Sequence, residues 1–316
     1  MDLSVVVPTL NGRDRLAACL DALAAHAPAA ELVVVNGPSA DGTTGMVRDR
    51  DDVDVLVETS DRTVNVARNA GIEVATGDAI AIVDYDNRIG ESWLAAAVNG
   101  LDHGDVVTGP VRAESADGES EAADAHDERT EDAPEHRTIA GRDVTYFAGG
   151  NVVFRRETLR DLDGFDEYLH TGGARDVAHR LAGTGHDVVW EPGLHVSKER
   201  PTRTAADGGR ESRDWGWKYR ALTYRLLKNY GIHPTVFGRT ATHAATDAAA
   251  VARDVVRGEA TPSGWVGHGR DVVYGIATGS SNGMIARAKD RSPARNPNGI
   301  SKRADRAVAK YDQRNE

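Results

Sequence analysis

The stretch Ala79-Ile80-Ala81-Ile82-Val83-Asp84-Tyr85-Asp86 decides the fold of this chain. Its first six residues, 79–84, are almost all apolar, which is typical of a strand buried on both faces. Two carboxylates lie at the carboxyl end of this strand, separated by one residue. Because residues two apart in an extended segment point to the same side, Asp84 and Asp86 can face one pocket. Two hard oxygen ligands at the rim of a parallel sheet suit a divalent cation that carries a substrate's phosphates.

Strand-like and helix-like segments alternate on both sides of this stretch, which predicts a parallel α/β sheet with helices on both faces. The first expected strand ends at Pro8. The expected strands are residues 3–7, 31–35, 53–58, 79–84, 105–109, 152–154 and 187–190, and the main expected helices are residues 14–25, 63–75, 93–101, 175–182, 215–230 and 240–256.

The composition of the 316 residues limits the possible partners and locations of the protein. A net charge of -11 disfavours nucleic acid or an anionic membrane as the partner of the whole surface. Six lysines against thirty-two arginines, with mainly aspartate among the acids, resemble the usage in proteins of salt-loving archaea. The single cysteine, Cys19, excludes an internal disulfide and is expected in the core. Without an apolar run of ~20 residues or a signal peptide, we expect a cytoplasmic protein, with attachment to a membrane surface left open.

Two segments have alternative interpretations. Residues 113–138 form a polar stretch with ten acidic side chains from Glu114 to Glu135, which indicates a solvated loop or a disordered insert. A lid over an acceptor site is the alternative. The helix at residues 215–230 interleaves aromatic and basic side chains, which suits either an anionic membrane interface or a core helix with solvated arginines. We expect residues 231–316 to form a helical, partly basic C-terminal extension.

Several motifs in a set order together resemble family 2 glycosyltransferases of the GT-A fold over residues 3–230. That stretch is therefore expected to form a GT-A nucleotide-diphospho-sugar transferase domain with a mostly parallel central sheet. The motifs are Val5-Val6-Val7-Pro8-Thr9-Leu10-Asn11, Glu31-Leu32-Val33-Val34-Val35-Asn36, Ser39-Ala40-Asp41-Gly42-Thr43, Ala67-Arg68-Asn69-Ala70-Gly71, Asp84-Tyr85-Asp86, Gly149-Gly150-Asn151 and Gly164-Phe165-Asp166-Glu167, with Asp176 further on.

The resemblance implies a role for each matching residue. Asp86 would bind the metal, Mg²⁺ or Mn²⁺, and Asp84 would contact ribose or metal-bound water. Asp176 falls on the second acid of the family's Glu-Asp pair and would be the catalytic base. The nucleotide-sugar would contact Pro8, Thr9, Asn11, Asn36, Ser39, Asp41, Arg68, Asn69 and Asp84, and the acceptor side would comprise Gly149, Gly150, Asn151 and Arg175.

Two residues depart from the family's pattern. Asn36 stands where the family usually has aspartate; asparagine keeps an acceptor and adds donors. Arg175 replaces the usual glutamate before Asp176, where a cation would lower the basicity of Asp176 or grip an anionic acceptor. A histidine is frequent in the family near Lys198, but His195 is out of register and is not assigned as a ligand.

The activity implied is an inverting, metal-dependent transfer of a hexose or hexuronic acid from a nucleotide-sugar, UDP-linked by preference, to a glycan hydroxyl. Similarity to haloarchaeal members implies a lipid-linked acceptor at the cytoplasmic membrane face, made for surface glycoproteins.

Four other functions are alternatives to this one. A sugar nucleotidyltransferase needs a glycine-rich basic turn after the first strand, and none appears before Gly12-Arg13. No G-x-G-x-x-G follows that strand and no Gly-Lys pair exists, which disfavours a dehydrogenase and a P-loop enzyme. A non-catalytic module that binds nucleotide-sugars is motivated by Asn36 and Arg175. Individually, Asp41 also fits an ordinary turn and Asp176 fits a helix N-terminus.

Overall fold

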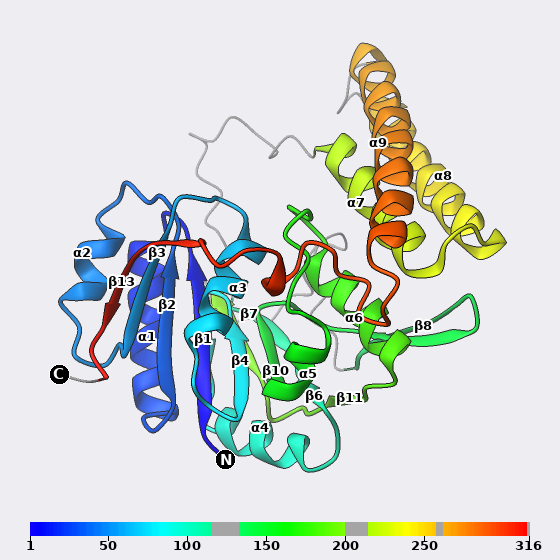
Figure 1. The fold of residues 1–316 in the computed structure, drawn as a ribbon. Coiled ribbons are helices and arrows are strands. Elements are labelled where there is room, and N and C mark those ends of the chain that lie inside the picture. The colour runs from blue at the N-terminus through cyan, green and yellow to red at the C-terminus, as the bar shows by residue number, and fades with distance from the viewer. Residues whose placement is uncertain (115–132, 200–213, 257–261, 315–316) are drawn as a thin grey trace.

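The computed structural model describes residues 1–114, 133–199, 214–256 and 262–314, and its centre is an eight-stranded sheet (Figure 1). The strand order is β11-β6-β10-β4-β1-β2-β3-β13. The bounds are β1 Leu3–Thr9, β2 Glu31–Asn36, β3 Val55–Thr59, β4 Ala79–Val83, β6 Val106–Thr108, β10 Asn151–Arg155, β11 Val188–Trp190 and β13 Ala307–Asp312.

Parallel pairing dominates the middle of this sheet, as the sequence predicted. β1 pairs in parallel with both β2 and β4, and β2 with β3, whereas β10 and β13 run antiparallel to their neighbours. The first strand does not end at Pro8 but continues to Thr9, with Pro8 opposite Val35. β4 pairs with β1 only up to Val6, so Pro8 lies where one side of β1 is already unpaired and its missing N–H is tolerated.

Alternate residues of the central strands enter two separate cores on the two faces of the sheet. Val6 and Ile82 belong to one core, and Val5, Ala81 and the buried Cys19 belong to the other. The first core is covered by α3 (Val64–Val74), α5 (Arg156–Asp161), α6 (Gly173–Thr184) and α7 (Trp215–Tyr230); the second is covered by α1 (Arg13–His26), α2 (Thr43–Arg48) and α4 (Trp93–Leu101). Burial on both faces explains why these strands are apolar without alternation.

Two small sheets lie beside the central one. β5 (Asn87–Ile89), β12 (Val196–Glu199) and β7 (Val111–Glu114) form one, and β8 (Glu135–Ile139) pairs with β9 (Arg142–Tyr146) in the other. The acidic segment expected as a loop at residues 113–138 is therefore bounded by strands, because β7 and β8 reach into it. Its middle, residues 115–132, lies outside the described part of the chain.

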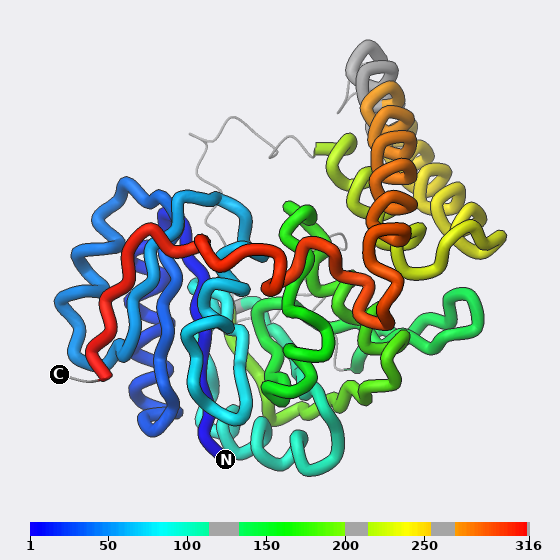
Figure 2. Tube along the Cα trace, viewed as in Figure 1, coloured from blue at the N-terminus to red at the C-terminus, as the bar shows by residue number. Residues whose placement is uncertain are grey.

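The C-terminal region is helical, but it also returns a strand to the sheet. α8 (Pro234–Val256) and α9 (Pro262–Lys289) lie side by side and project from the body, and α9 packs closely on α7 (Figure 1). Gly279 makes this approach possible, since a Cβ there would lie 2.3 Å from the backbone oxygen of Arg220. After α9 the chain crosses the body, through a 3₁₀ turn at Ile300–Lys302, and ends as β13 against β3 (Figure 2).

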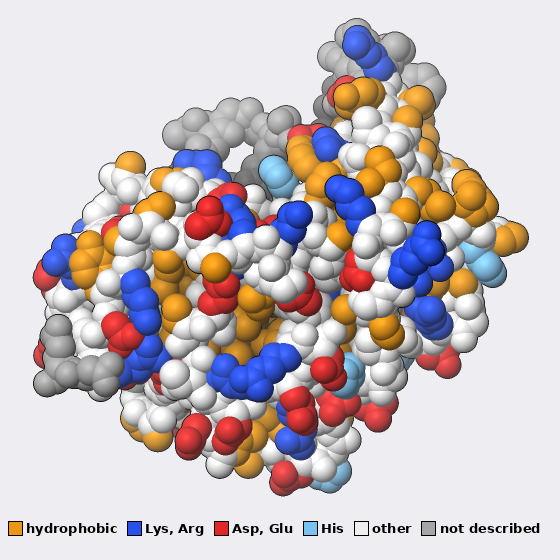
Figure 3. Space-filling model, in the orientation of Figure 1, with side chains coloured by type: hydrophobic (Ala, Val, Ile, Leu, Met, Phe, Trp, Pro, Cys, Tyr) orange, Lys and Arg blue, Asp and Glu red, His pale blue; other side chains and the backbone are white. Residues whose placement is uncertain are grey.

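The aromatic and basic helix α7 is a core helix. Tyr219, Tyr224 and Lys228 are buried, and no side chain of α7 is fully exposed. Exposed apolar side chains occur instead around α8 and α9, including Ile232, Phe237, Val273 and Tyr274, and Figure 3 shows apolar side chains gathered on that projection. Among the described residues, no helix combines the length and apolar character needed to cross a bilayer.

Candidate active site

Asp84 and Asp86 lie where β4 leaves the carboxyl edge of the sheet. The backbone N–H of Asp84 donates to the carbonyl of Gly150, 3.1 Å away, and the same carbonyl accepts from Nδ2 of Asn87 at 2.8 Å. A Cβ on Gly150 would lie 2.1 Å from the Asp84 carboxylate. Glycine is therefore required at this position, because the turn before β10 runs directly against the first carboxylate.

Arg68 faces Asp84 from α3. Its Nη2 lies 3.2 Å from Oδ1 of Asp84, and its guanidinium also lies over the ring of Phe165. The Nε atom of Arg68 is buried and has no hydrogen-bond partner in the structure. A buried donor without a partner, beside a carboxylate that is 24% exposed, indicates a place that a polar ligand completes.

Lys198 of β12 faces the second carboxylate. Its Nζ is 3.1 Å from Oδ2 of Asp86, with the lysine side chain 36% exposed and the aspartate 13%. Each aspartate is thus paired with one basic side chain: Asp84 with Arg68 and Asp86 with Lys198. Two acids and two bases at one sheet edge can hold a diphosphate together with its cation.

The two carboxylates fit a divalent ion that arrives with phosphate. They supply the hard oxygen atoms that Mg²⁺ and Mn²⁺ prefer. Across the described ranges, no group of three or more His, Cys, Asp or Glu side chains is placed to hold a metal ion. The remaining ligands of a six-coordinate ion would therefore have to come from substrate and water.

The turns after β1 and β2 meet at the same edge through a hydrogen-bond network. The backbone N–H of Asn11 donates to Oγ of Ser39, and the Ser39 hydroxyl donates to Oδ1 of Asn36. Oδ1 of Asn11 accepts from the backbone N–H of Ala40. Asn36 also donates to Thr44. Asn36 is buried in these contacts. The structure therefore brings Asn11, Asn36 and Ser39 together, as predicted, but their side chains join the two turns to each other.

Thr9 and Asp41 have contrasting surroundings in these turns. The hydroxyl of Thr9 is buried and has no hydrogen-bond partner among the described residues. Asp41 accepts from the N–H groups of Arg13 and Thr43 and from the hydroxyl of Thr43. The hydrogen bond from Thr43 and that from the Arg13 N–H lower the pKa of Asp41. Asp41 therefore stabilises the turn before α2, as expected of an ordinary turn aspartate.

Asn69 and Asn151 have internal partners as well. Asn69 bonds the N–H and the carbonyl of Phe165 and the carboxylate of Glu167, which fixes the Gly164–Glu167 turn to α3. Asn151 accepts from the Trp93 indole and donates to the carbonyl of Leu194. Both side chains are fully buried, so in this arrangement they position the site and do not face it.

Asp176 lies at the centre of a closed ionic network. Its Oδ2 accepts from Nε of Arg180 and from Nζ of Lys228, each at 2.8 Å, and its Oδ1 accepts from Asn229 at 3.0 Å. Lys228 also binds Asp166 at 2.6 Å, and these side chains are shielded from solvent. Burial alone would raise the pKa of Asp176, but Lys228 and Arg180 outweigh it and lower that pKa to about 2.

Lys228, Arg180 and Asp166 are central here, yet the sequence singled out only Asp166, as part of the Gly164-Phe165-Asp166-Glu167 motif. Arg180 follows Asp176 at helical i,i+4 spacing, which was the available signal for this arginine. Arg175, by contrast, turns outward, with Nη2 2.9 Å from Glu135 of β8 and its guanidinium over the ring of Tyr146. It does not contact the Asp176 carboxylate, whose cationic partners come from α6 and α7.

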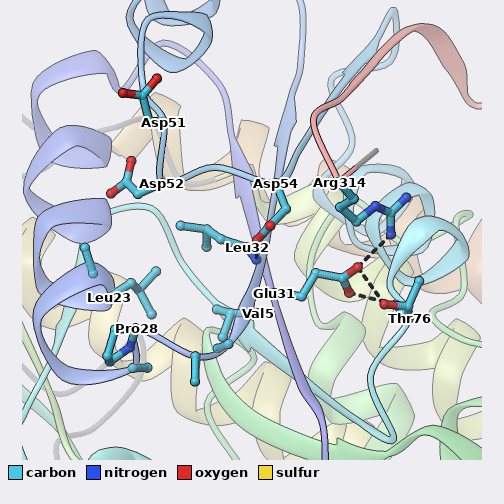
Figure 4. Close-up of a pocket in the computed structure, with 14 residues that line it drawn as sticks. Val5, Leu23, Pro28, Glu31, Leu32, Asp51, Asp52, Asp54, Thr76 and Arg314 are labelled. Carbon is cyan, nitrogen blue, oxygen red and sulfur yellow. Dashed lines mark hydrogen bonds and ion pairs between the residues drawn. The ribbon is translucent and has the colours of Figure 1, made fainter. Parts of the chain in front are cut away.

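A hollow of about 540 Å³ lies far from these residues, at the opposite edge of the sheet (Figure 4). It is lined by Glu31 at the start of β2, by Thr76, by Asp51 and Asp54, and by Arg314, which pairs with Glu31. Ligands of open parallel α/β sheets bind at the carboxyl ends of strands, so this hollow at the amino ends is not the candidate site.

Comparison with known proteins agrees with this geometry. The model of the family "Glycosyl transferase family 2" matches residues 4–163, about half of the chain. The chain is 28% identical over 212 residues to glycosyltransferase AglE of Haloferax volcanii, covering 62% of this chain and 67% of AglE. It is 26% identical over 227 residues to a pre-mycofactocin glycosyltransferase of Mycobacterium tuberculosis, covering 68% of this chain but 44% of that protein.

Solved structures show the same fold. A mannosyltransferase, PcManGT of Pyrobaculum calidifontis in complex with GDP-Man and Mn²⁺, superposes with a TM-score of 0.53 at 20% identity, covering 89% of this chain and 86% of that one. TarS residues 1–349 of S. aureus, in complex with UDP-GlcNAc, gives a TM-score of 0.52 at 20% identity, covering 73% and 68%. The chain therefore belongs to glycosyl transferase family 2, a family of sugar-transferring enzymes with the GT-A fold.

Proposed function

We propose that this protein transfers a sugar from a nucleotide-sugar to a hydroxyl of a glycan by a single displacement that inverts the anomeric configuration. The observation that carries the proposal is the arrangement at the end of β4, where Asp84 and Asp86 lie beside Arg68 and Lys198. The diphosphate of the donor would lie between these charges. The unpartnered Thr9 hydroxyl and Arg68 Nε are the protein groups that the nucleotide would satisfy.

Asp86 would hold a divalent cation, Mg²⁺ or Mn²⁺, with Asp84 contacting ribose or a water on that cation. When bound, such an ion stabilises the negative charge that develops on the leaving diphosphate. Lys198 would move from Asp86 to a phosphate oxygen as the ion takes its place. This keeps the charge at the site balanced while donor and cation bind together.

Asp176 would remove the proton from the attacking hydroxyl, as its position in the motif implies. In the present arrangement its carboxylate is enclosed by Arg180, Lys228 and Asn229, and a carboxylate with a pKa of about 2 is a weak base. The role therefore requires Lys228 and Asn229, both on α7, to move away when the acceptor binds. Loss of the Lys228 charge would raise the pKa of Asp176 and strengthen it as a base.

The donor and acceptor are proposed from the relatives. PcManGT holds GDP-Man and TarS holds UDP-GlcNAc, so members of this fold differ in nucleotide. We favour a UDP-linked hexose or hexuronic acid. We propose a lipid-linked glycan acceptor at the cytoplasmic membrane face, destined for surface glycoproteins, as the resemblance of the motifs to haloarchaeal members of the family implies. The similarity to glycosyltransferase AglE of Haloferax volcanii supports sugar transfer. The arginine-rich, aspartate-rich composition supports work in concentrated salt.

Nucleotide release from a panel of UDP- and GDP-sugars, with and without Mn²⁺ and in high salt, tests the proposal. We expect Asp86→Asn to lower turnover by about 10²–10³-fold, the usual cost of losing one electrostatic contact to the transition state. Asp102→Asn, at an exposed position after α4, is the matched control and should leave turnover unchanged. Wild-type turnover in Asp86→Asn would refute the assigned role. Binding of UDP without turnover of any donor would favour the non-catalytic module.

A further inference from the structure

Arg225 of α7 has an unsatisfied guanidinium. Its Nε is buried without a hydrogen-bond partner, and no carboxylate of the described residues lies within ion-pair distance of it. Its Nη1 lies against Gly172, where a Cβ would be only 2.6 Å away. Burial lowers the pKa of Arg225 to about 10, and the positive charges of Arg175 and Arg239 act in the same direction. A partly buried cation without an ion-pair partner costs stability unless a ligand uses it.

Arg239 of α8 adds a second cation, whose charge acts on Glu135 although the two side chains form no ion pair. It is half-buried, and it forms no ion pair or hydrogen bond with any part of the chain that the structure describes. The nearby His179 is neutral, because burial and then the charge of Arg225 lower its pKa well below the usual value. The ring of His179 instead bonds the hydroxyls of Tyr146 and Tyr230. It therefore supplies no further charge of either sign.

The acidic groups around these arginines are already matched. Asp176 is paired with Arg180 and Lys228. Glu135 is shared between Arg175 and Arg137, 2.9 and 3.2 Å away, and Asp247 is held by Lys218 and the hydroxyl of Tyr219. The surroundings of Arg225 and Arg239 therefore carry an excess of positive charge.

The N-terminus of α6 faces the same place. Gly172, the residue before the helix, has φ +74° and offers no side chain to cap it. The amide groups of Gly173, Ala174 and Arg175 have no acceptor among the described residues, as expected for a first turn without a cap. These amides and the helix dipole favour an anion. The Arg225 guanidinium beside Gly172 supplies the full positive charge that the amides lack.

This place adjoins the donor side of the active site. A Cβ on Gly149 would lie 3.0 Å from the Cβ of Ala174 and 3.1 Å from Nη2 of Arg68, the same nitrogen that binds Asp84. Gly149 thus lies between the first turn of α6 and the Arg68–Asp84 pair. An anion held at α6 would belong to a molecule whose other end reaches the reacting sugar.

We propose that Arg225, with Arg239 and the first-turn amides of α6, forms a subsite for an anionic group of the acceptor, a phosphoryl or a carboxylate. The inference rests on the proposed transfer reaction and names the class of its second substrate: a glycan that carries a negative charge near the hydroxyl that is glycosylated. A neutral glycan would leave Arg225 partly buried and without an ion pair. The anion would pair with Arg225 in the same way that Glu135 pairs with Arg175.

Binding of small probes to the full chain tests the subsite. The probes are hexyl phosphate for a lipid-type phosphoryl group, methyl glucuronide for a sugar carboxylate, and methyl glucoside as the neutral reference. Each is titrated calorimetrically with and without saturating UDP and Mn²⁺. We expect at least one anionic probe to bind in both conditions and the glucoside to bind far more weakly. The anionic probe that binds identifies the source of the charge.

Variants separate this subsite from the donor site. Arg225→Gln should weaken the bound anionic probe by about tenfold or more, as loss of a charged hydrogen bond does, and Arg225→Lys should restore part of it. UDP affinity and thermal stability should not fall, because the Arg225 side chain has no ion pair or hydrogen bond to lose among the described residues. Arg253→Gln, an exposed arginine on α8, is the control and should change nothing.

Each contrary outcome has one meaning. Equal affinity of wild type and Arg225→Gln for every anionic probe, or absence of anionic binding to the wild type, overturns the subsite. Binding that UDP abolishes assigns the arginines to the donor diphosphate and also overturns it. Failure of UDP to bind the wild type, with the anionic probe still bound through Arg225, refutes the proposed reaction while leaving the anion site in place.

Discussion

Replacing Lys228 by methionine is expected to lower the free energy of unfolding by about 3 kcal/mol, the lower end of the 3–5 kcal/mol typical of a broken buried ion pair. Its Nζ lies 2.6 Å from Asp166 and 2.8 Å from Asp176, and all three side chains are fully buried. Methionine keeps the apolar stem but leaves two carboxylates without this cation. The lower end applies because Arg180 and Asn229 still bind Asp176.

Denaturant unfolding at pH 7 and constant salt, followed by tryptophan fluorescence, measures this loss. Lys310→Met is the matched control, since Lys310 is 41% exposed and, within the described ranges, pairs only with Asp312; its cost should stay below about 1 kcal/mol. In the double variant Lys228→Met, Asp176→Asn, part of the loss should be recovered, because one unpaired charge is removed with its partner. The reasoning is wrong if Lys228→Met costs no more than the control, or if the two changes simply add.

Three further results are expected. Gly150→Ala places a methyl group 2.1 Å from the Asp84 carboxylate and should weaken UDP binding by about tenfold in calorimetry, whereas Gly45→Ala, with open space around it, should not. Arg306→Met removes a fully buried partner of two glutamates and should cost about 3 kcal/mol in denaturant unfolding; a cost near zero would contradict this. Because the folded-state pKa of Asp176, about 2, lies below its ordinary value, its stabilising contribution should be complete above about pH 4 and be lost as the pH falls toward 2. In Asp176→Asn, the loss of stability between about pH 4 and pH 2, followed by circular dichroism, should therefore be smaller than in the wild type. An equal loss in the two proteins would exclude this contribution.

The central sheet could be predicted from the sequence because its strands are apolar on both faces and end at polar turns. The pairing of β13 with β3 could not, because Ala307–Asp312 alternates weakly and its partner is far away in the sequence. The nature of α7 was left open for a similar reason. Aromatic and basic residues at helical spacing suit both a membrane surface and a core that contains buried acids, and only the position of Asp166 and Asp176 decides between them.

Motif order located the candidate site but not the role of each side chain in it. Asp84 and Arg68 lie together, as expected of residues around one ligand. Asn69 and Asn151 instead make hydrogen bonds to backbone segments far away in the sequence, and no local pattern distinguishes such an amide from one that faces a ligand. Arg225 belongs to none of the motifs. Its importance comes from the absence of a partner, which appears only when the surrounding elements are in place.

The pairing of β13 with β3 also determines the order in which the molecule can be completed. β3, at residues 55–59, is synthesised early, whereas its neighbour at residues 307–312 is synthesised after all three C-terminal helices. Until then one side of β3 presents unpaired backbone groups, which other chains can pair with. The folding of the nascent enzyme thus depends on a strand pairing that forms late and over a long sequence separation. Its yield during expression should be sensitive to how long ribosomes take to reach β13.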